Sequence, residues 1–263
     1  MTRWDPAQYL EFGNERTRPF IDLLARVPVD AQTVADLGCG PGNDVPPLRR
    51  RWPDARIVGV DSSPEMIERA RAVEPGVEFE IGDVATWDGS ADVVVTNATL
   101  QWVPGHRALL PRLADSASKA FAFQVPGNHI SPSHVLMREI GAEFGVRDVR
   151  PLEVATAGEY LADLARPGWD VDAWETTYCH VLRGEDPVFE WVSGTGARPY
   201  LQALSDADRP DFVARYKAAL RDAYPKTEIG GAPATVLPFR RVFAVATRHG
   251  VARLSAGAGG HPQ

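Results

Sequence analysis

Five short apolar runs alternate with helical patterns in the first half of the chain. Each is bounded by polar or turn residues, and they lie at residues 33–37, 56–60, 77–81, 91–96 and 119–124. Continuous apolar runs of this length are typical of strands buried on both faces of a parallel sheet. Because helical segments separate the runs, the pattern predicts right-handed crossovers and a doubly wound α/β sheet.

The second half of the chain predicts two further strands with helices between them. Residues 171–182 alternate apolar and polar positions well enough for a strand, and residues 235–247 contain another. The stretch 185–225 is rich in helical pattern. We therefore expect a helical cap, inserted at 184–232 before the last strand, that stands over the carboxyl edge of the sheet and covers a binding pocket there.

The remaining stretches complete a chain expected to form one domain over residues 1–263. The sheet core is expected at 30–183 and 233–250. Residues 1–28 predict two short helices that form a lid before the sheet, and the Gly- and Ala-rich stretch 255–263 predicts a disordered tail. No internal repeat and no linker divides the sequence.

An acid and three alternating glycines end the first apolar run. Asp36 lies two residues before Gly38, and Gly40 and Gly42 follow at alternate positions. Glycine lacks Cβ, so a ligand can approach the backbone closely. The segment 44–51 then predicts a helix whose N-terminus faces that ligand. This arrangement is the crevice at the carboxyl end of a strand, where open α/β sheets bind cofactors.

The glycine spacing distinguishes between possible cofactors. Dinucleotide sites use G-x-G-x-x-G and bind a pyrophosphate at the helix N-terminus, whereas this turn reads G-x-G-x-G after an acid. S-adenosylmethionine has no phosphate and carries an ammonium and a sulfonium. Asp61 ends the second strand at the spacing of a ribose-binding acid, and Asp83 follows the third. Each acid alone could be a turn or cap residue, but together they indicate S-adenosylmethionine.

These residues resemble the class I S-adenosylmethionine-dependent methyltransferases. Further motifs, spread from about Trp4 to Arg248, look together like the bacterial trans-aconitate 2-methyltransferase family. They are Trp4-Asp5-Pro6, Tyr9-Leu10, Arg16-Thr17-Arg18-Pro19, Ala35 to Asn43, Asp61-Ser62-Ser63-Pro64, Asn97 to Trp102, His134 to Glu139, Trp191-Val192, Thr195-Gly196 and Arg198-Pro199. The sequence departs from the more familiar family pattern at Asp44-Val45-Pro46-Pro47, where the prolines fit the first turn of a helix.

The resemblance implies a fold and a cofactor. The fold is a Rossmann-like, seven-stranded, mostly parallel sheet with helices on both faces. The cofactor is S-adenosyl-L-methionine, with S-adenosyl-L-homocysteine as product. The residues expected to bind it are Asp36, Gly38, Gly40, Gly42, Asn43, Asp61, Ser62, Asp83, Val84, Asn97, Tyr9 and Arg16.

The residues expected to contact the acceptor are less specific. They are Trp4, Arg18, Trp102, His129, Trp191, Arg198 and Tyr200. Arginine suits a tricarboxylate because its planar fork binds a carboxylate bidentately, and Arg198 is the preferred anchor. Other candidates are Arg16, Arg138, Arg240, Arg241, Tyr178 and, as a substrate contact or base, His134. No residue is a certain catalytic group, and Asn97 and Gln101 are expected to position the reactants.

Composition and charge narrow the possible substrates and the expected location of the protein. The chain of 263 residues has a net charge of −7, which argues against nucleic acid as substrate, and its two cysteines make no disulfide framework. No apolar run suits a membrane span or a signal segment, so we expect a soluble cytoplasmic protein. Histidines and acids show no metal-ligand spacing.

The predicted activity is methyl transfer to a carboxylate oxygen of trans-aconitate. A carboxylate is already ionised at pH 7, so in-line displacement needs alignment and desolvation but no general base. The alternatives are methylation of another small metabolite and a non-catalytic S-adenosylmethionine-binding module. A NAD-dependent dehydrogenase is disfavoured by the glycine spacing.

Overall fold

The computed structural model describes residues 17–147, 154–194 and 196–254. The chain separates into two compact units, which we describe one at a time. The sheet unit comprises Met1–Val125, Ala155–Glu175 and Val242–Gln263, and the helical unit comprises Pro126–Val154 and Thr176–Arg241. The predicted lid before residue 17 and the predicted tail after residue 254 lie outside the described residues.

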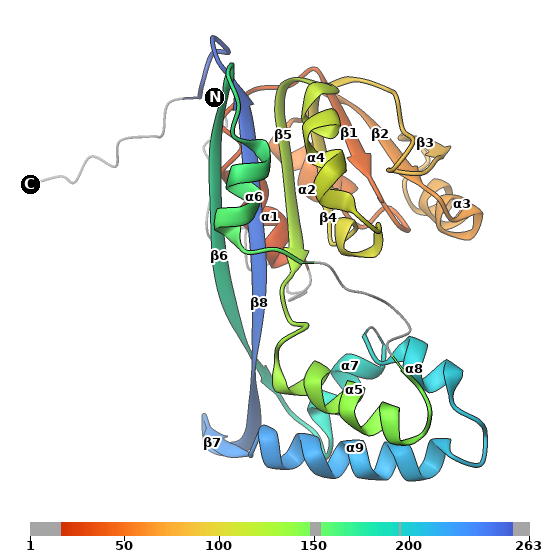
Figure 1. Cartoon of the computed structure of the whole chain (residues 1–263). Helices are drawn as coiled ribbons and strands as arrows, with labels where there is room; N and C mark the ends of the chain where they lie inside the picture. Colours follow the sequence, from red (N-terminus) through yellow and green to blue (C-terminus); the bar gives the residue numbers. More distant parts are fainter. Residues whose placement is uncertain (1–16, 148–153, 195, 255–263) are drawn as a thin grey trace, which may run out of the picture. The chain divides into compact units, whose positions relative to one another are not determined.

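The apolar runs of the sequence form the strands of one sheet. Within the described residues it has eight strands in the order β3-β2-β1-β4-β5-β8-β6, with β7 paired to β8 (Figure 1). The neighbouring pairs from β3 to β5 are parallel. The strands are β1 (Thr33–Leu37), β2 (Arg56–Asp61), β3 (Glu78–Ile81), β4 (Ala91–Asn97), β5 (Ala117–Pro126), β6 (Trp169–Leu182), β7 (Thr227–Ile229) and β8 (Ala232–Arg248).

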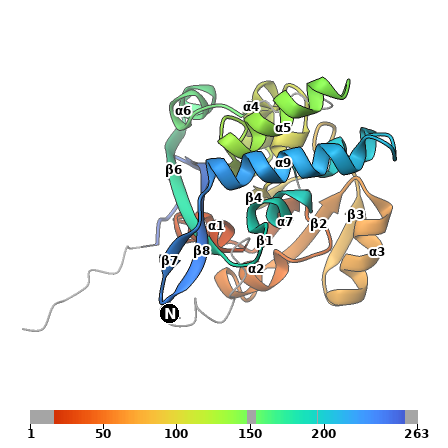
Figure 2. The same ribbon diagram turned by 90° about the horizontal axis from the view of Figure 1, so that it is seen from below.

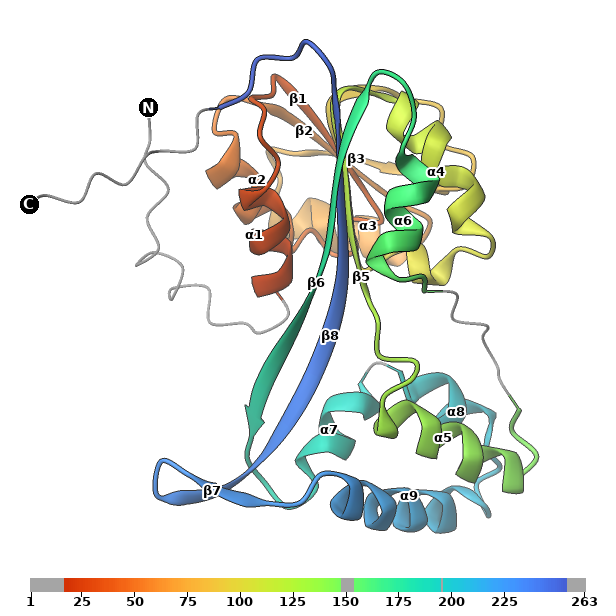
Figure 3. The same ribbon diagram turned by 60° about the vertical axis from the view of Figure 1, so that its left-hand side comes forward.

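Helices cover both faces of the sheet within the sheet unit. Figure 3 shows α1 and α2 on one face and α4 and α6 on the other. Phe20, Leu23 and Leu24 of α1 share one side at helical spacing and are fully buried. The helices are α1 (Arg18–Ala25), α2 (Val45–Arg51), α3 (Pro64–Val73), α4 (His106–Asp115) and α6 (Ala157–Leu164), with a 3₁₀ turn, η2, at Leu100–Trp102.

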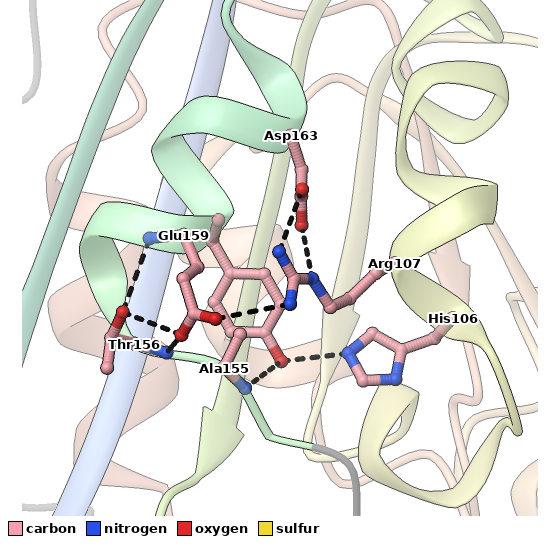
Figure 4. A network of polar contacts seen from close by, with 7 residues as sticks. His106, Arg107, Ala155, Thr156, Glu159 and Asp163 are labelled. Atoms are coloured by element: carbon pink, nitrogen blue, oxygen red, sulfur yellow. Dashed lines mark hydrogen bonds and ion pairs between the residues drawn. The ribbon is translucent and has the colours of Figure 1, made fainter.

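A polar network joins α6 to α4 inside the sheet unit (Figure 4). Arg107 donates from Nε and Nη2 to the two carboxylate oxygens of Asp163, at 2.7 and 3.0 Å. The buried Tyr160 hydroxyl lies 2.8 Å from Nε2 of His106. Thr156 and Glu159 form a capping box at the start of α6. These contacts fix the helix that leads into β6.

The helical unit has its own apolar core. It contains α5 (Pro132–Glu143), α7 (Pro187–Ser193), α8 (Arg198–Ala203) and α9 (Arg209–Ala223). Phe212, Tyr216 and Leu220 recur at every fourth position of α9 and pack in one cluster with Met137 and Ile140 of α5. Figure 2 shows α5 and α9 side by side.

The observed fold matches the predicted doubly wound sheet, with eight strands in the described residues rather than seven because the short β7 pairs with β8. The helical part is larger than the predicted insertion. The prediction placed residues 30–183 in the sheet core and only 184–232 in the cap, whereas the helical unit also takes in α5 and the adjoining parts of β6 and β8. The physical reason is that α5 buries Met137 and Ile140 against α9. No helix in the described ranges combines the length and apolarity needed to cross a membrane.

Candidate functional site

The glycine turn after β1 adopts a conformation that favours glycine. Gly38, Gly40 and Gly42 have φ of +80°, +54° and +86°, which L side chains rarely adopt. A Cβ added to Gly38 would lie 2.2 Å from the Thr99 side chain, so this glycine allows close packing. At Gly40 a Cβ would meet nothing within 4 Å. The turn therefore presents open space at Gly40.

Asp61 holds the glycine turn in place from the end of β2. Its Oδ2 accepts a hydrogen bond from the Gly40 amide at 2.9 Å, and its Oδ1 accepts one from the Ser63 amide at 2.8 Å. Each carboxylate oxygen keeps a further lone pair for a ligand hydroxyl. The neighbouring Ser62 is exposed, as is Asn43 at the end of the turn.

Asp36 is a buried carboxylate without a donor. It is fully buried in β1, and neither of its oxygens has a hydrogen-bond partner among the described residues. Burial, followed by the charges of Asp44 and Asp61, raises its pKa well above the ordinary range. Because a buried charge without a partner is costly, this position suits a cationic ligand or a ligand donor.

Asp44 is the site residue that the sequence analysis missed. It precedes α2 and is only 8% exposed. Both of its oxygens accept from Nδ2 of Asn97, at 3.0 and 2.9 Å, and Oδ1 of Asn97 accepts from Nε2 of the buried Gln124. Burial raises the pKa of Asp44 to about 7, although the Asn97 hydrogen bond opposes the shift. Two signals could have revealed the network: an acid directly after the glycine turn and a glutamine ending an apolar strand.

The turn after β4 is tightly bonded to the glycine turn. The Thr99 hydroxyl donates to the Gly38 carbonyl at 3.3 Å, and Ala98 has a positive φ of 51°. Nε2 of Gln101 donates to the Ala98 carbonyl at 2.5 Å, while its buried Oε1 lacks a partner within the described structure. Trp102 is 40% exposed. Asn97 and Gln101 therefore lie on the rigid turn expected to position the reactants.

Asp83 and Val84 follow β3 in the chain and differ in burial. Asp83 is exposed, and its Oδ1 accepts from the Ala85 amide at 2.8 Å, as in a turn-forming acid. Val84 is 5% exposed.

Trp4, Tyr9 and Arg16 lie outside the described residues, and a contact of theirs with the cofactor or the acceptor stays a prediction.

The residues expected to bind the acceptor are divided between the sheet unit, the helical unit and positions outside the described residues. Tyr200 is 5% exposed and packs in the apolar core of the helical unit, so it is not part of the proposed site. Trp191 stacks on the ring of His180 with centroids 4.6 Å apart. Arg198 begins α8, but its side chain lies outside the described structure, and Arg18 is exposed at the start of α1.

Four basic side chains instead lie close together in the helical unit. They are His129, His134, Arg138 and Arg240. Arg138 donates from Nη1 to the His129 carbonyl at 2.7 Å. Burial, then Arg138 and His129, lowers the pKa of His134 to about 4. Burial, then Arg240 and Arg138, lowers the pKa of His129 as well.

Comparison with known proteins supplies the family. A model described as a methyltransferase domain matches residues 34–119. A trans-aconitate 2-methyltransferase from Streptomyces avermitilis is 50% identical over 262 residues, covering 92% of this chain and 96% of that protein. One from Escherichia coli O157:H7 is 42% identical over 253 residues, covering 94% and 99%. The chain belongs to the trans-aconitate 2-methyltransferase family.

Solved structures agree on the fold of this methyltransferase. The YcgJ protein from Bacillus subtilis has a TM-score of 0.55 at 14% identity and covers 87% of this chain and 97% of its own. A putative methyltransferase complexed with the Trm112 activator, from Haloferax volcanii, has a TM-score of 0.53 at 18% identity and covers 92% and 93%. The predicted class I methyltransferase fold is confirmed.

The residues of this family member fit S-adenosylmethionine, the methyl donor of class I methyltransferases. Asp36 offers buried oxygens that lack a donor, and Gly40 leaves open space where a side chain would stand. Among the described residues there is no group of three side chains that could hold a metal ion. The buried Asp36, with Asp44 and Asp61 near it, makes this an acid-lined site that matches an organic cation.

Proposed function

We propose that the chain transfers a methyl group from S-adenosylmethionine to a carboxylate oxygen of trans-aconitate, giving a monomethyl ester. The family names support the substrate. The observation that carries the proposal is the acid-lined glycine turn: the buried oxygens of Asp36 lack donors among the described residues, and Gly40 leaves open space where a side chain would stand. S-adenosylmethionine, when bound, supplies a methyl group activated on a sulfonium.

The acids of the sheet unit provide the negative charge for this cofactor. Asp36 and Asp44 are buried, and their pKa values are raised in the free protein. A bound cation favours the ionised carboxylates and offsets the cost of their burial. Asp61 keeps the Gly40 amide in place, so the turn is preorganised before the cofactor binds.

The chain's own residues then need only to align the acceptor. A carboxylate acceptor is ionised at pH 7, so no proton has to be removed before its oxygen attacks. Asn97 is locked between Asp44 and Gln124, and Gln101 is held by the Ala98 carbonyl. Neutral amides in fixed positions can orient a carboxylate without competing for a proton. We therefore assign these two residues to positioning rather than to acid–base catalysis.

The proposed acceptor is a small anion rather than a nucleic acid. The net charge of −7 disfavours binding of a polyanion, whereas local arginines can still recognise carboxylates. The expected cytoplasmic location and a role for the helical unit as a cap over the acceptor stay predictions.

A substrate panel tests the proposal. The purified chain is incubated with methyl-labelled S-adenosylmethionine and with trans-aconitate, cis-aconitate, citrate, isocitrate or no acceptor. We expect trans-aconitate to give the highest kcat/KM, by on the order of tenfold or more. Methyl transfer only to an unrelated metabolite would favour the alternative of methylating another small metabolite. Cofactor binding without methyl transfer would favour a non-catalytic binding module.

A further inference from the structure

The basic cluster of the helical unit consists of side chains that the fold brings together from three places. His129 lies just before α5, His134 and Arg138 lie on α5, and Arg240 lies on β8. His134 and Arg138 are four residues apart, so they share one face of the helix. All four side chains are partly exposed and so can be reached by a small ligand.

The backbone around the cluster is fixed by Asn128. Its Oδ1 accepts from the Arg240 amide at 2.8 Å, and its Nδ2 donates to the Arg240 carbonyl at 3.2 Å. The Gly127 amide donates to the same carbonyl at 2.9 Å. These bonds tie the segment before α5 to β8 and hold His129 and Arg240 near each other.

Arg138 and the two histidines of the cluster keep donor capacity. Arg138 spends one N–H group on the His129 carbonyl and forms no ion pair with a described residue. Four N–H groups of its guanidinium are therefore not committed by that bond. Nδ1 of His129 is buried and has no hydrogen-bond partner in the described part of the chain. Nδ1 of His134 lies 3.3 and 3.2 Å from the hydroxyls of Ser131 and Ser133.

We propose that the cluster of His129, His134 and Arg138, with Arg240 beside it, binds a carboxylate group of the acceptor. The guanidinium of Arg138 offers paired donors that match a carboxylate, and the two imidazoles can add single donors. Burial, and then the neighbouring cations, disfavour protonation of both histidines, and a bound anion offsets the part that comes from the cations. Arg138 is therefore the preferred anchor among the described arginine side chains. This inference rests on the proposed function for the identity of the acceptor.

Arg138→Ala is the main test, with Arg215→Ala as its matched control. Arg215 belongs to the same unit but lies outside the cluster and pairs with Glu143. With saturating S-adenosylmethionine, Arg138→Ala should raise KM for trans-aconitate roughly thirty- to a thousandfold, the loss typical of an unpaired charge contact. The Kd for S-adenosylmethionine should stay within about twofold, and Arg138→Lys should recover part of the loss. Arg215→Ala should change neither constant by more than about twofold.

A second variant guards against a folding defect in Arg138→Ala. A Cβ on Gly196 would lie 2.9 Å from Nε2 of His134, so Gly196→Ala should displace that ring without removing a charge. We expect this variant to melt cooperatively by circular dichroism and to raise KM for trans-aconitate. If KM is unchanged in both Arg138→Ala and Gly196→Ala, or if Arg138→Ala weakens S-adenosylmethionine as strongly as the acceptor, the inference is wrong.

Calorimetry separates this inference from the proposed function. Propane-1,2,3-tricarboxylate and trans-aconitate are titrated into the wild-type chain and into Arg138→Ala, without methyl transfer. Binding that is lost in the variant supports the cluster even if no ester is formed. If the ester is formed but Arg138→Ala binds the tricarboxylates as the wild type does, the proposed role of the cluster is wrong and the proposed function stands. A wild-type chain that binds neither tricarboxylate overturns both.

Discussion

Nδ2 of Asn97 donates to both carboxylate oxygens of Asp44, at 3.0 and 2.9 Å. The bonds join the end of β4 to the residue that precedes α2, where the glycine turn ends. Asp44 is buried, and its pKa is about 7 against an ordinary value of 3.8. The free protein therefore carries an acid that would be easier to ionise in the unfolded chain.

Asp44→Asn should stabilise the free protein more at high pH than at low pH. Because the folded pKa is raised, wild-type stability falls as pH rises from about 4 to about 7, where the unfolded state is ionised and the folded state is not. Between pH 5 and pH 8 the advantage of the variant should grow by about 2–3 kcal/mol, at 1.36 kcal/mol per pKa unit. Urea unfolding at the two pH values measures it. An advantage that does not depend on pH would mean that Asp44 titrates normally.

Gly40→Val should abolish cofactor binding while leaving a folded protein. Gly40 has a left-handed φ, and its missing Cβ would point into open space, where we place the cofactor. Gly168→Val is the matched control, because Gly168 also has a left-handed φ, of +88°, and nothing within 4 Å. Both variants should lose similar stability from backbone strain. Equal S-adenosylmethionine affinity in the two, by calorimetry, would place the cofactor elsewhere.

Asp61→Ala should weaken S-adenosylmethionine binding by on the order of 1.5–3 kcal/mol, the range for hydrogen bonds to a charged group. The variant loses the acceptor for the Gly40 amide and the proposed acceptor for the ribose hydroxyls. Asp83→Ala, at an exposed turn, should have a smaller effect. Calorimetry that gives wild-type affinity for Asp61→Ala would remove Asp61 from the site.

His134 should make the protein less stable in acid. Its pKa is lowered from 6.5 to about 4, so the unfolded chain takes up a proton in that window while the folded chain does not. The free energy of unfolding should fall by about 3 kcal/mol as pH drops from 6.5 to 4. His134→Gln should remove this part of the slope, whereas His249→Gln, at an exposed histidine, should keep it. Identical slopes in wild type and His134→Gln would show that the histidine is readily protonated.

The sheet was predictable because its signals are local. The apolar runs at 33–37 and 56–60 match β1 and β2 almost residue for residue. The alternating glycines likewise anticipate a turn whose left-handed φ values only glycine adopts readily. Buried parallel strands and tight turns depend on short stretches of sequence, so one chain is enough to read them.

The helical unit was harder to predict because its boundaries depend on long-range packing. Tyr200 looked like a binding residue in sequence, but it packs against Gly141 and fills an apolar core. α5 joined that core although it follows the fifth strand directly. The Asp44–Asn97 contact joins residues 53 positions apart, and no periodicity encodes such a pair.

The most direct test of the proposed activity is the identity of the methylated product. Trans-aconitate is incubated with the chain and with S-adenosylmethionine carrying a carbon-13 methyl group, and the product is analysed by NMR and mass spectrometry. We predict one labelled methyl per molecule, present as a carboxylate ester and released as methanol in base. A label on carbon, or no labelled trans-aconitate at cofactor and acceptor concentrations that saturate binding, would contradict the account.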